Sequence, residues 1–249
     1  MRDFTLATYR DFVRSLASHD IYTVKKYIVT RPAKGIVLRH DVDVSPEKAL
    51  RMAQIDHELN VQSTYYFRYP KTFNPEILKK ISDMGHEIGY HYEVLDKTQG
   101  NIDDAMKLFM QELNLFREYV EVTTVSMHGG VLTKYDNREI WKHNSFSDYG
   151  LIGEPYISID YSKIYYFTDT GRDWSGKYSV KDTVEKPGPY ADTIKNTADL
   201  IELLKKNESE LFVITIHPKR WSASKTEWWF ELIIQSIKNR GKSLLKMWG

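Results

Sequence analysis

The sequence predicts an α/β fold, a distorted (β/α) barrel of about seven strands that occupies residues 1–249 as one domain. Strand-like and helix-like segments alternate from residue 36 onward, which is typical of βα units and a mainly parallel sheet. About six or seven strands in a chain of 249 residues favour barrel-like closure over an open doubly wound sheet. No Gly-x-Gly-x-x-Gly or phosphate-loop motif follows any strand, so binding of a nucleotide cofactor has little support.

The predicted strands are runs of apolar or β-branched residues, most of which end in polar side chains. They are Ile36–His40, Ser63–Arg68, Glu87–His91, Thr123–Met127, Ile157–Ile159, Ile164–Thr168 and Leu211–Ile216. The predicted helices carry apolar residues at helical spacing. They are a leading helix Leu6–Leu16, then Pro46–Leu59, Pro75–Met84, Ile102–Tyr119, Asn137–Lys142, Thr193–Lys206 and a closing helix from Lys225 to about Lys238. Ser45 and Asn74 precede two of these helices as expected caps, and a proline follows each in the first helical position.

Composition excludes several classes of protein. The 35 basic and 34 acidic residues give a net charge of +1 without a basic block, so nucleic-acid binding is not expected. The absence of cysteine excludes disulfides, thiolate metal sites and thiol nucleophiles. No apolar run approaches the ~18 residues of a membrane span. The first residues lack the core of a signal peptide, so a complete chain of this sequence is expected in the cytoplasm, in an oligomeric state that the sequence leaves open.

The segment Ile36–Glu47 is the most informative stretch. Its apolar run ends at Asp41-Val42-Asp43, which places two carboxylates at the C-terminal end of a strand, where parallel α/β folds carry their chemistry. Two charges so close to the interior of a sheet are costly unless a cation or a proton offsets them. The pair is therefore a candidate metal ligand and general base.

Other residues suited to metal binding or acid–base chemistry also follow predicted strands. They are His91 with Glu93, His128, Asp169 with Asp173 and Trp174, and His217. Structural alternatives remain open for five of the candidates. Asp41 and Asp43 can cap the strand–helix junction, and His91 can be a core histidine. His128 can serve a tight turn, and His217 can simply end a strand. We interpret His40 and His86 as structural, and Trp228-Trp229 as core residues.

Four segments form a recognisable series of motifs. They are Arg39-His-Asp41-Val-Asp43-Val-Ser-Pro-Glu47, Gly85-His86-Glu87-Ile88-Gly89-Tyr90-His91, Asp169-Thr-Gly-Arg-Asp173-Trp174 and Ile214-Thr-Ile-His217. This series resembles the NodB-homology polysaccharide deacetylases, carbohydrate esterase family 4. That family opens with Thr-Phe-Asp-Asp-Gly followed closely by Ser-Pro-Glu, and its second motif leads through Gly-His-Glu-Ile-Gly into a ligand histidine. They span residues 36 to 218, and the first two together are the more specific.

The chain departs from the family pattern at three points. Val42 separates aspartates that are adjacent in the family, so either Asp41 or Asp43 can be the ligand. Leu95 stands where the family has its second ligand histidine, and His128-Gly129-Gly130 replaces an Arg-Pro-Pro-Tyr stretch. The third ligand is then His128 or, alternatively, Glu93.

The resemblance implies a divalent metal, with zinc favoured, held by Asp43, His91 and His128, although such a site also accepts cobalt, nickel or iron. Asp41 is then the general base and His217 the general acid. Asp169 and Asp173 are expected to orient a histidine or hold an arginine such as Arg172 or Arg39. Trp174 is expected to wall the pocket, and Glu93 to bind substrate or support the ligands.

The expected activity is hydrolysis of an acyl group, foremost N-acetyl, from a carbohydrate, with N-formyl and O-acetyl as open alternatives. A cytoplasmic location suggests a precursor such as a nucleotide-linked or lipid-linked sugar. Two rival hypotheses remain: a non-catalytic glycan-binding or scaffold protein on the same fold, and an amidohydrolase that acts on a non-sugar C–N bond.

Overall fold

The computed structural model describes residues 2–130, 133–179, 184 and 193–248, with side chains described up to residue 240. Its centre is a parallel sheet whose strands are β1 (Ile21–Tyr22), β2 (Gly35–Val42), β3 (Thr64–Phe67), β4 (Glu87–Tyr92), β5 (Val125–Met127), β6 (Tyr165–Thr168) and β7 (Leu211–Ile216). The order across the sheet is β5-β4-β3-β2-β7-β6, and β1 pairs with the start of β2. Every pairing is parallel, as the alternation of segments predicts.

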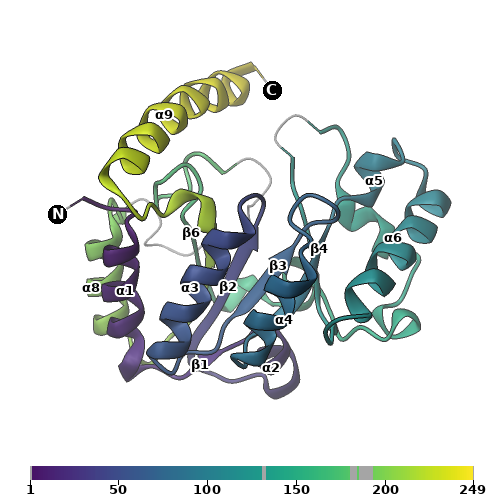
Figure 1. Ribbon diagram of the computed structural model, residues 1–249, viewed down its shortest axis with the longest axis horizontal. Helices are drawn as coiled ribbons and strands as arrows, with labels where there is room; N and C mark the ends of the chain where they lie inside the picture. Colours follow the sequence, from purple (N-terminus) through teal and green to yellow (C-terminus); the bar gives the residue numbers. More distant parts are fainter. Residues whose placement is uncertain (1, 131–132, 180–183, 185–192, 249) are drawn as a thin grey trace.

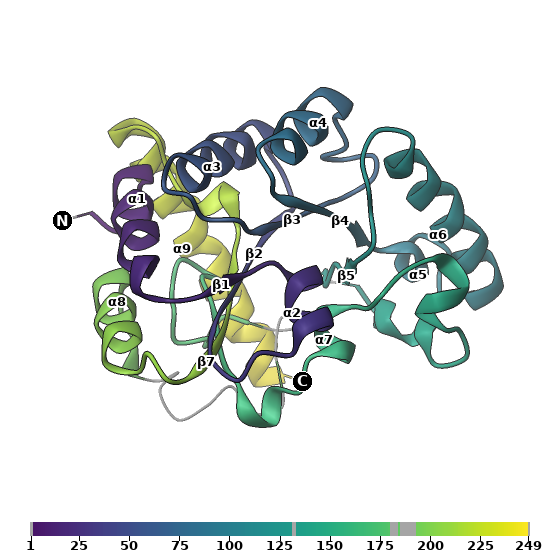
Figure 2. The same ribbon diagram turned by 90° about the horizontal axis from the view of Figure 1, so that it is seen from below.

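The sheet curls, and no strand pairing in the described part of the chain joins β5 to β6 (Figure 2). The predicted fold class, a distorted (β/α) barrel of about seven strands, is therefore confirmed in an open, half-barrel form. Parallel pairing brings the carboxyl ends of all these strands to one edge of the sheet. That edge is where the polar residues that follow each strand collect.

The helices surround the sheet (Figure 1). They are α1 (Leu6–Ser15), α2 (Val24–Thr30), α3 (Pro46–Glu58), α4 (Pro75–Asp83), α5 (Val94–Lys97), α6 (Ile102–Arg117), α7 (Pro155–Ser158), α8 (Thr197–Lys206) and α9 (Lys225–Trp248). Helix α1 packs against α3 and α8, and α3 packs against α4. No helix in the described residues is long and apolar enough to cross a membrane.

Two large apolar clusters hold this arrangement together. One packs α4 and α6 onto β3 and β4, and the other packs α1 and α8 onto β2 and β7. Every residue of β2 and β7 is buried, which agrees with the apolar stretches Ile36–Leu38 and Leu211–Ile214 in these strands. Burial on both faces fixes the direction in which their final residues point.

Several local predictions need correction. Ile157–Ile159 is not a strand, because Glu154 accepts a hydrogen bond from the Ile157 amide and Pro155 opens the short helix α7. Ser45 does not cap α3 with its side chain, because its backbone is left-handed with φ 58°. Asn74 does cap α4, accepting from the Ile77 amide. Strand β1 and helix α2 were not predicted.

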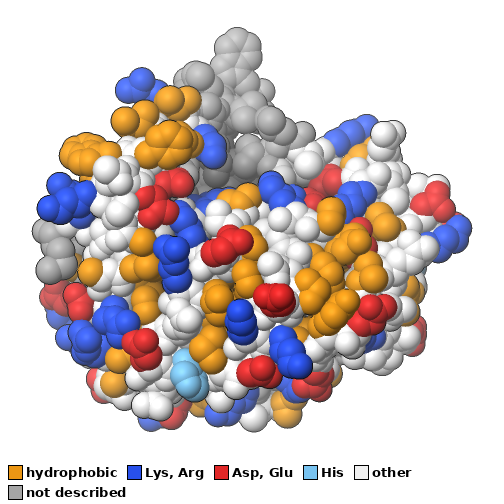
Figure 3. Space-filling model, in the orientation of Figure 1, with side chains coloured by type: hydrophobic (Ala, Val, Ile, Leu, Met, Phe, Trp, Pro, Cys, Tyr) orange, Lys and Arg blue, Asp and Glu red, His pale blue; other side chains and the backbone are white. Residues whose placement is uncertain are grey.

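The closing helix also differs from its prediction. It runs to Trp248, ten residues beyond the expected end at about Lys238. Trp229 is 52% exposed and Phe230 is 64% exposed, so the prediction that Trp228-Trp229 packs in the core is wrong for Trp229. Figure 3 shows apolar side chains at the surface over the start of this helix. Helix amphipathicity alone does not say whether an apolar face is covered.

Candidate functional site

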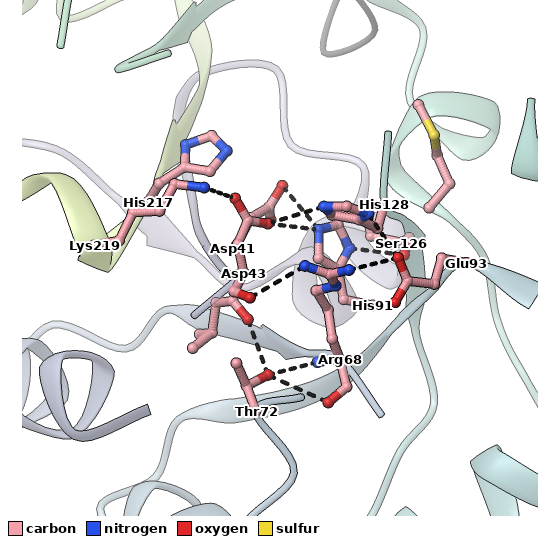
Figure 4. A network of polar contacts seen from close by, with 12 residues as sticks. Asp41, Asp43, Arg68, Thr72, His91, Glu93, Ser126, His128, His217 and Lys219 are labelled. Carbon is pink, nitrogen blue, oxygen red and sulfur yellow. Dashed lines mark hydrogen bonds and ion pairs between the residues drawn. The ribbon is translucent and has the colours of Figure 1, made fainter. Parts of the chain in front are cut away.

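Residues from four strand ends meet around one cavity of about 570 Å³. Asp43 follows β2, His91 belongs to β4, His128 follows β5 and His217 follows β7, and all four line the cavity (Figure 4). Parallel strands place their carboxyl ends at a common edge, so residues far apart in sequence become neighbours. The predicted clustering of these residues is therefore present in the fold.

Asp41 is held by an arginine on its own strand. Arg39 Nη2 donates to Asp41 Oδ2 at 2.6 Å and Arg39 Nε donates to Oδ1 at 3.1 Å, and both side chains are fully buried. The two residues are two apart on β2, so their side chains share a face. Burial alone would raise the pKa of Asp41, but the charges of Arg39, His91 and His217 outweigh it and lower the pKa. Asp41 is therefore an ionised carboxylate at neutral pH.

Asp43 lies between two imidazoles. Its Oδ1 is 3.6 Å from Nε2 of His91 and 3.6 Å from Nε2 of His128. His91 Nε2 is also 3.9 Å from Asp41 Oδ2. Two ligands of a tetrahedral zinc ion, each about 2.0–2.1 Å from it, are roughly 3.3 Å apart. Each Asp43-to-histidine distance is thus a few tenths of an ångström longer than the spacing of two ligands on one ion.

The far nitrogen of each imidazole has a partner. His91 Nδ1 lies 2.9 Å from the carbonyl oxygen of Ser126, and His128 Nδ1 lies 3.0 Å from Glu93 Oε2. Glu93 in turn accepts from Arg68 Nη2 at 2.6 Å. Burial raises the pKa of Glu93, but His128 and Arg68 outweigh it and lower the pKa to about 2. The hydrogen bond of His91 Nδ1 is characteristic of metal-binding histidines, because it fixes the tautomer that leaves Nε2 as the ligand atom.

A lysine occupies the other side of Asp43. Lys219 Nζ donates to Asp43 Oδ2, and the pKa of Asp43 is low because the charges of Lys219 and the histidines outweigh its burial. Within the described residues, no three acidic or histidine side chains already meet the geometry of a bound ion. The donor atoms of Asp43, His91 and His128 nevertheless suit a divalent cation, since carboxylate and imidazole are its usual ligands.

His217 is fixed by a buried aspartate. Its Nδ1 lies 2.7 Å from Asp169 Oδ1, and its backbone amide donates to Asp169 Oδ2 at 3.0 Å. Arg220 Nη1 at 2.7 Å and Trp221 Nε1 at 2.8 Å also donate to this carboxylate. Burial raises the pKa of Asp169, but the charges of Arg220 and His217 lower it to about 2. The carboxylate therefore holds Nδ1 of the imidazole and turns the rest of the ring toward the cavity.

The Asp169 carboxylate makes stability depend on pH in a predictable direction. Its pKa is about 2 in the fold against an ordinary 3.8, so it stabilises the folded state above about pH 4 and loses this contribution as the pH falls toward 2. The wild type should lose about 2 kcal/mol more unfolding free energy than Asp169→Asn between pH 5 and pH 2. Urea denaturation at each pH measures this difference, and parallel curves for the two proteins would contradict it.

Two predicted site residues lie elsewhere. Asp173 accepts from the Ser175 amide at 2.9 Å and pairs with Lys177 at 2.8 Å, within its own turn. Trp174 is 1% exposed and packs in the apolar cluster under α1, so the prediction that it walls the pocket is wrong. Its indole needs a hydrogen-bond partner once buried, and it finds Thr197 Oγ1 at 3.0 Å.

The arginines also differ from expectation. Arg39 pairs with Asp41, not with Asp169 or Asp173, and Arg172 lies over the rings of Phe4 and Trp228. Arg220, absent from the prediction, is the residue that holds Asp169.

The structural interpretation of the two remaining buried histidines agrees with the fold. His40 Nε2 lies 2.8 Å from the Tyr9 hydroxyl, and its ring stacks on Tyr65. His86 Nε2 lies 2.9 Å from the Ala53 carbonyl oxygen. Burial lowers the pKa of His40 to about 3 and that of His86 to about 4, so both are neutral packing groups.

The residues that the sequence analysis missed at the site are mostly cations. They are Arg68, Lys219 and Arg220, together with Ser126 and Trp221. Arg68 ends a predicted strand and could have been found by the rule that identified His91. Lys219 has no such signal, because only the turn after His217 brings its ammonium group to Asp43.

Comparisons with known proteins found similar solved structures but no matching family. No family model matches the chain, and no curated protein matches it. Solved structures that are similar include a mutant of a CE4 family pseudoenzyme of Bacillus anthracis with restored enzymatic activity, at 16% identity and a TM-score of 0.43. The match covers 84% of this chain and 64% of the pseudoenzyme chain. This chain therefore spans less than two thirds of the length of that protein.

Two further structures belong to the same group. A CE4 esterase of Streptococcus mutans is 15% identical with a TM-score of 0.49, over 92% of this chain and 89% of the other. A peptidoglycan deacetylase of Bacillus subtilis is 14% identical with a TM-score of 0.41, over 87% of this chain and 98% of the other. CE4 is the family that the sequence motifs resemble, and the similarity concerns the fold.

Proposed function

We propose that this chain is a divergent family-4 carbohydrate esterase, a metal-dependent hydrolase that removes an acyl group, foremost N-acetyl, from a carbohydrate, with residues 1–249 acting as one domain. The observation that carries the proposal is the position of Asp43 Oδ1, 3.6 Å from Nε2 of both His91 and His128. Two further side chains accompany this group. The Asp41 carboxylate is paired with Arg39, and the His217 imidazole is paired with Asp169. Metal-assisted hydrolysis of an acyl group can use these three elements as the Lewis acid site, the general base and the general acid.

Asp43, His91 and His128 would hold the ion, for which zinc is our first choice. When bound, such an ion polarises the acyl oxygen and makes a water molecule acidic near neutral pH. Glu93 supports His128 from behind and is assigned a positioning role, because its carboxylate contacts His128 Nδ1 and Arg68. Asp43, not Asp41, is the proposed ligand because Arg39 already engages both oxygens of Asp41.

The remaining residues move protons. The ionised Asp41 carboxylate accepts a proton from the attacking water, and Arg39 keeps it ionised and aligned. His217 donates a proton to the departing amine or alcohol. Asp169 holds His217 Nδ1, which orients the opposite nitrogen for this transfer.

The double variant His91→Ala/His128→Ala tests the ligand set. We expect the wild type to bind about one equivalent of zinc and the variant to lose it, as measured by elemental analysis after dialysis. His40→Ala/His86→Ala is a control that removes two buried imidazoles outside the cavity. Full zinc occupancy in the first variant would refute the ligand set, as would an equal loss in the control.

One observation favours a rival function, a non-catalytic glycan-binding protein on this fold. Lys219 already pairs with Asp43, so the negative charge of this carboxylate is partly neutralised without a metal ion. Acetate release from a panel of N-acetylated and O-acetylated sugars, with zinc added, separates the two functions. Zinc binding without any release would favour the rival, and release only from non-sugar amides would favour an amidohydrolase. A cytoplasmic location stays a prediction, which cell fractionation would test.

A further inference from the structure

The cavity carries an excess of positive charge that the rest of the chain does not share. Its lining includes five basic side chains, Arg68, Lys71, Lys219, Arg220 and Lys238, against one carboxylate, Asp43. The chain as a whole is almost balanced, with 35 basic and 34 acidic residues. A concave site lined by one sign of charge attracts ligands of the opposite sign.

Pairing inside the site leaves part of this charge uncompensated. Arg68 is paired with Glu93, Arg220 with Asp169 and Lys219 with Asp43. Lys71 and Lys238 have no carboxylate partner among the described residues. The two lysines come from separate elements, the turn after β3 and helix α9, which passes over the edge where β2 ends (Figure 1).

The pKa of Lys71 reflects the same crowding. Partial burial lowers it, and the charges of Arg68 and Lys219 lower it further, against a smaller opposing effect of Asp43 and Glu93. Lys71 therefore experiences a net positive surrounding, which an anion would relieve.

The lining also indicates what the cavity does not bind well. No Phe, Tyr or Trp is among its described lining residues, so it lacks the broad aromatic ring faces against which neutral sugars usually stack. Amino groups bind phosphate as point charges, and two uncompensated lysines match a group that bears about two negative charges.

From these observations we propose that the substrate is an acylated sugar that carries a phosphate or diphosphate group, and that Lys71 and Lys238 bind this group. The inference rests on the proposed function and deepens it. Lys71 and Lys238 are then residues of substrate specificity, while His91, His128 and His217 serve the acyl group at the strand ends.

The test is an equilibrium binding measurement by calorimetry, which needs no turnover. Methyl N-acetylglucosaminide is the neutral probe, and N-acetylglucosamine 1-phosphate is the charged one. The same sugar joined through diphosphate to uridine, or to a short prenyl chain in detergent, distinguishes the sources of the phosphate. We expect at least one phosphate-bearing probe to bind about tenfold or more tightly than the neutral sugar, and its Kd to rise with added NaCl.

Lys71→Gln/Lys238→Gln should remove most of that preference while binding of the neutral sugar stays within about twofold. Lys79→Gln/Lys80→Gln on α4 removes the same charge outside the cavity and should keep the preference. Equal affinity for neutral and charged probes would overturn the inference, as would an equal loss in both double variants.

Failure of the proposed function gives a different result. In that case the lysine-dependent preference for phosphate persists while the zinc-loaded protein releases no acetate from any probe. Conversely, if the protein releases acetate but binds neutral and phosphorylated sugars with equal affinity, only the inference about the phosphate group is overturned.

Discussion

Replacement of Asp41 by Asn should reduce acyl hydrolysis by about 10²–10⁴-fold, the usual contribution of a general base. The amide has nearly the same shape as the carboxylate but cannot accept the proton of the attacking water. Zinc content should stay unchanged, because Asp43 and not Asp41 lies between His91 and His128. The measurement is acetate release under zinc-saturated conditions, with elemental analysis of the same sample.

The variant also leaves the buried Arg39 without its counter-charge, so a loss of activity through unfolding needs a control. Arg39→Met/Asp41→Asn removes both charges together and should be more stable than Arg39→Met alone, yet remain as inactive as Asp41→Asn. An active double variant would end the role of Asp41 as base. Turnover by Asp41→Asn within a few-fold of the wild type would end it as well.

Replacement of Arg39 by Met should lower the free energy of unfolding by about 3–5 kcal/mol. Arg39 and Asp41 are 0% and 1% exposed, so removal of the arginine leaves a buried carboxylate without its counter-charge. The arginine also donates to Ser126 Oγ at 2.8 Å, a bond that methionine cannot replace. Chemical denaturation monitored by tryptophan fluorescence gives the difference.

A surface pair provides the matched comparison. Arg14 and Asp11 are paired at 2.9 Å, but their side chains are 60% and 50% exposed. Arg14→Met should therefore cost no more than about 1 kcal/mol, because water and salt screen an exposed pair. Similar losses for the two arginine variants would contradict the assignment of Arg39 as a buried clamp.

The sequence predicted the site best where the signal is local. The apolar stretches Ile36–Leu38 of β2 and Leu211–Ile214 of β7 predict strands, and the residues at the ends of these strands then lie at the carboxyl edge of the sheet. Asp43, His91, His128 and His217 were found in this way and line one cavity. Ile157–Ile159 failed because three apolar residues do not distinguish a strand from one turn of helix.

The parallel α/β architecture and the convergence of Asp43, His91, His128 and His217 could be predicted from the sequence, since both follow from the pattern of apolar runs and from strand direction. The cations that join them, and the pairing of all these side chains, became visible only in the folded chain. Arg39 meets Asp41, Arg220 meets Asp169, Lys219 meets Asp43, and Trp174 turns into the core instead of the cavity. The physical reason is that a charge or a ring takes the partner that packing brings within reach, and packing joins residues that are distant along the chain.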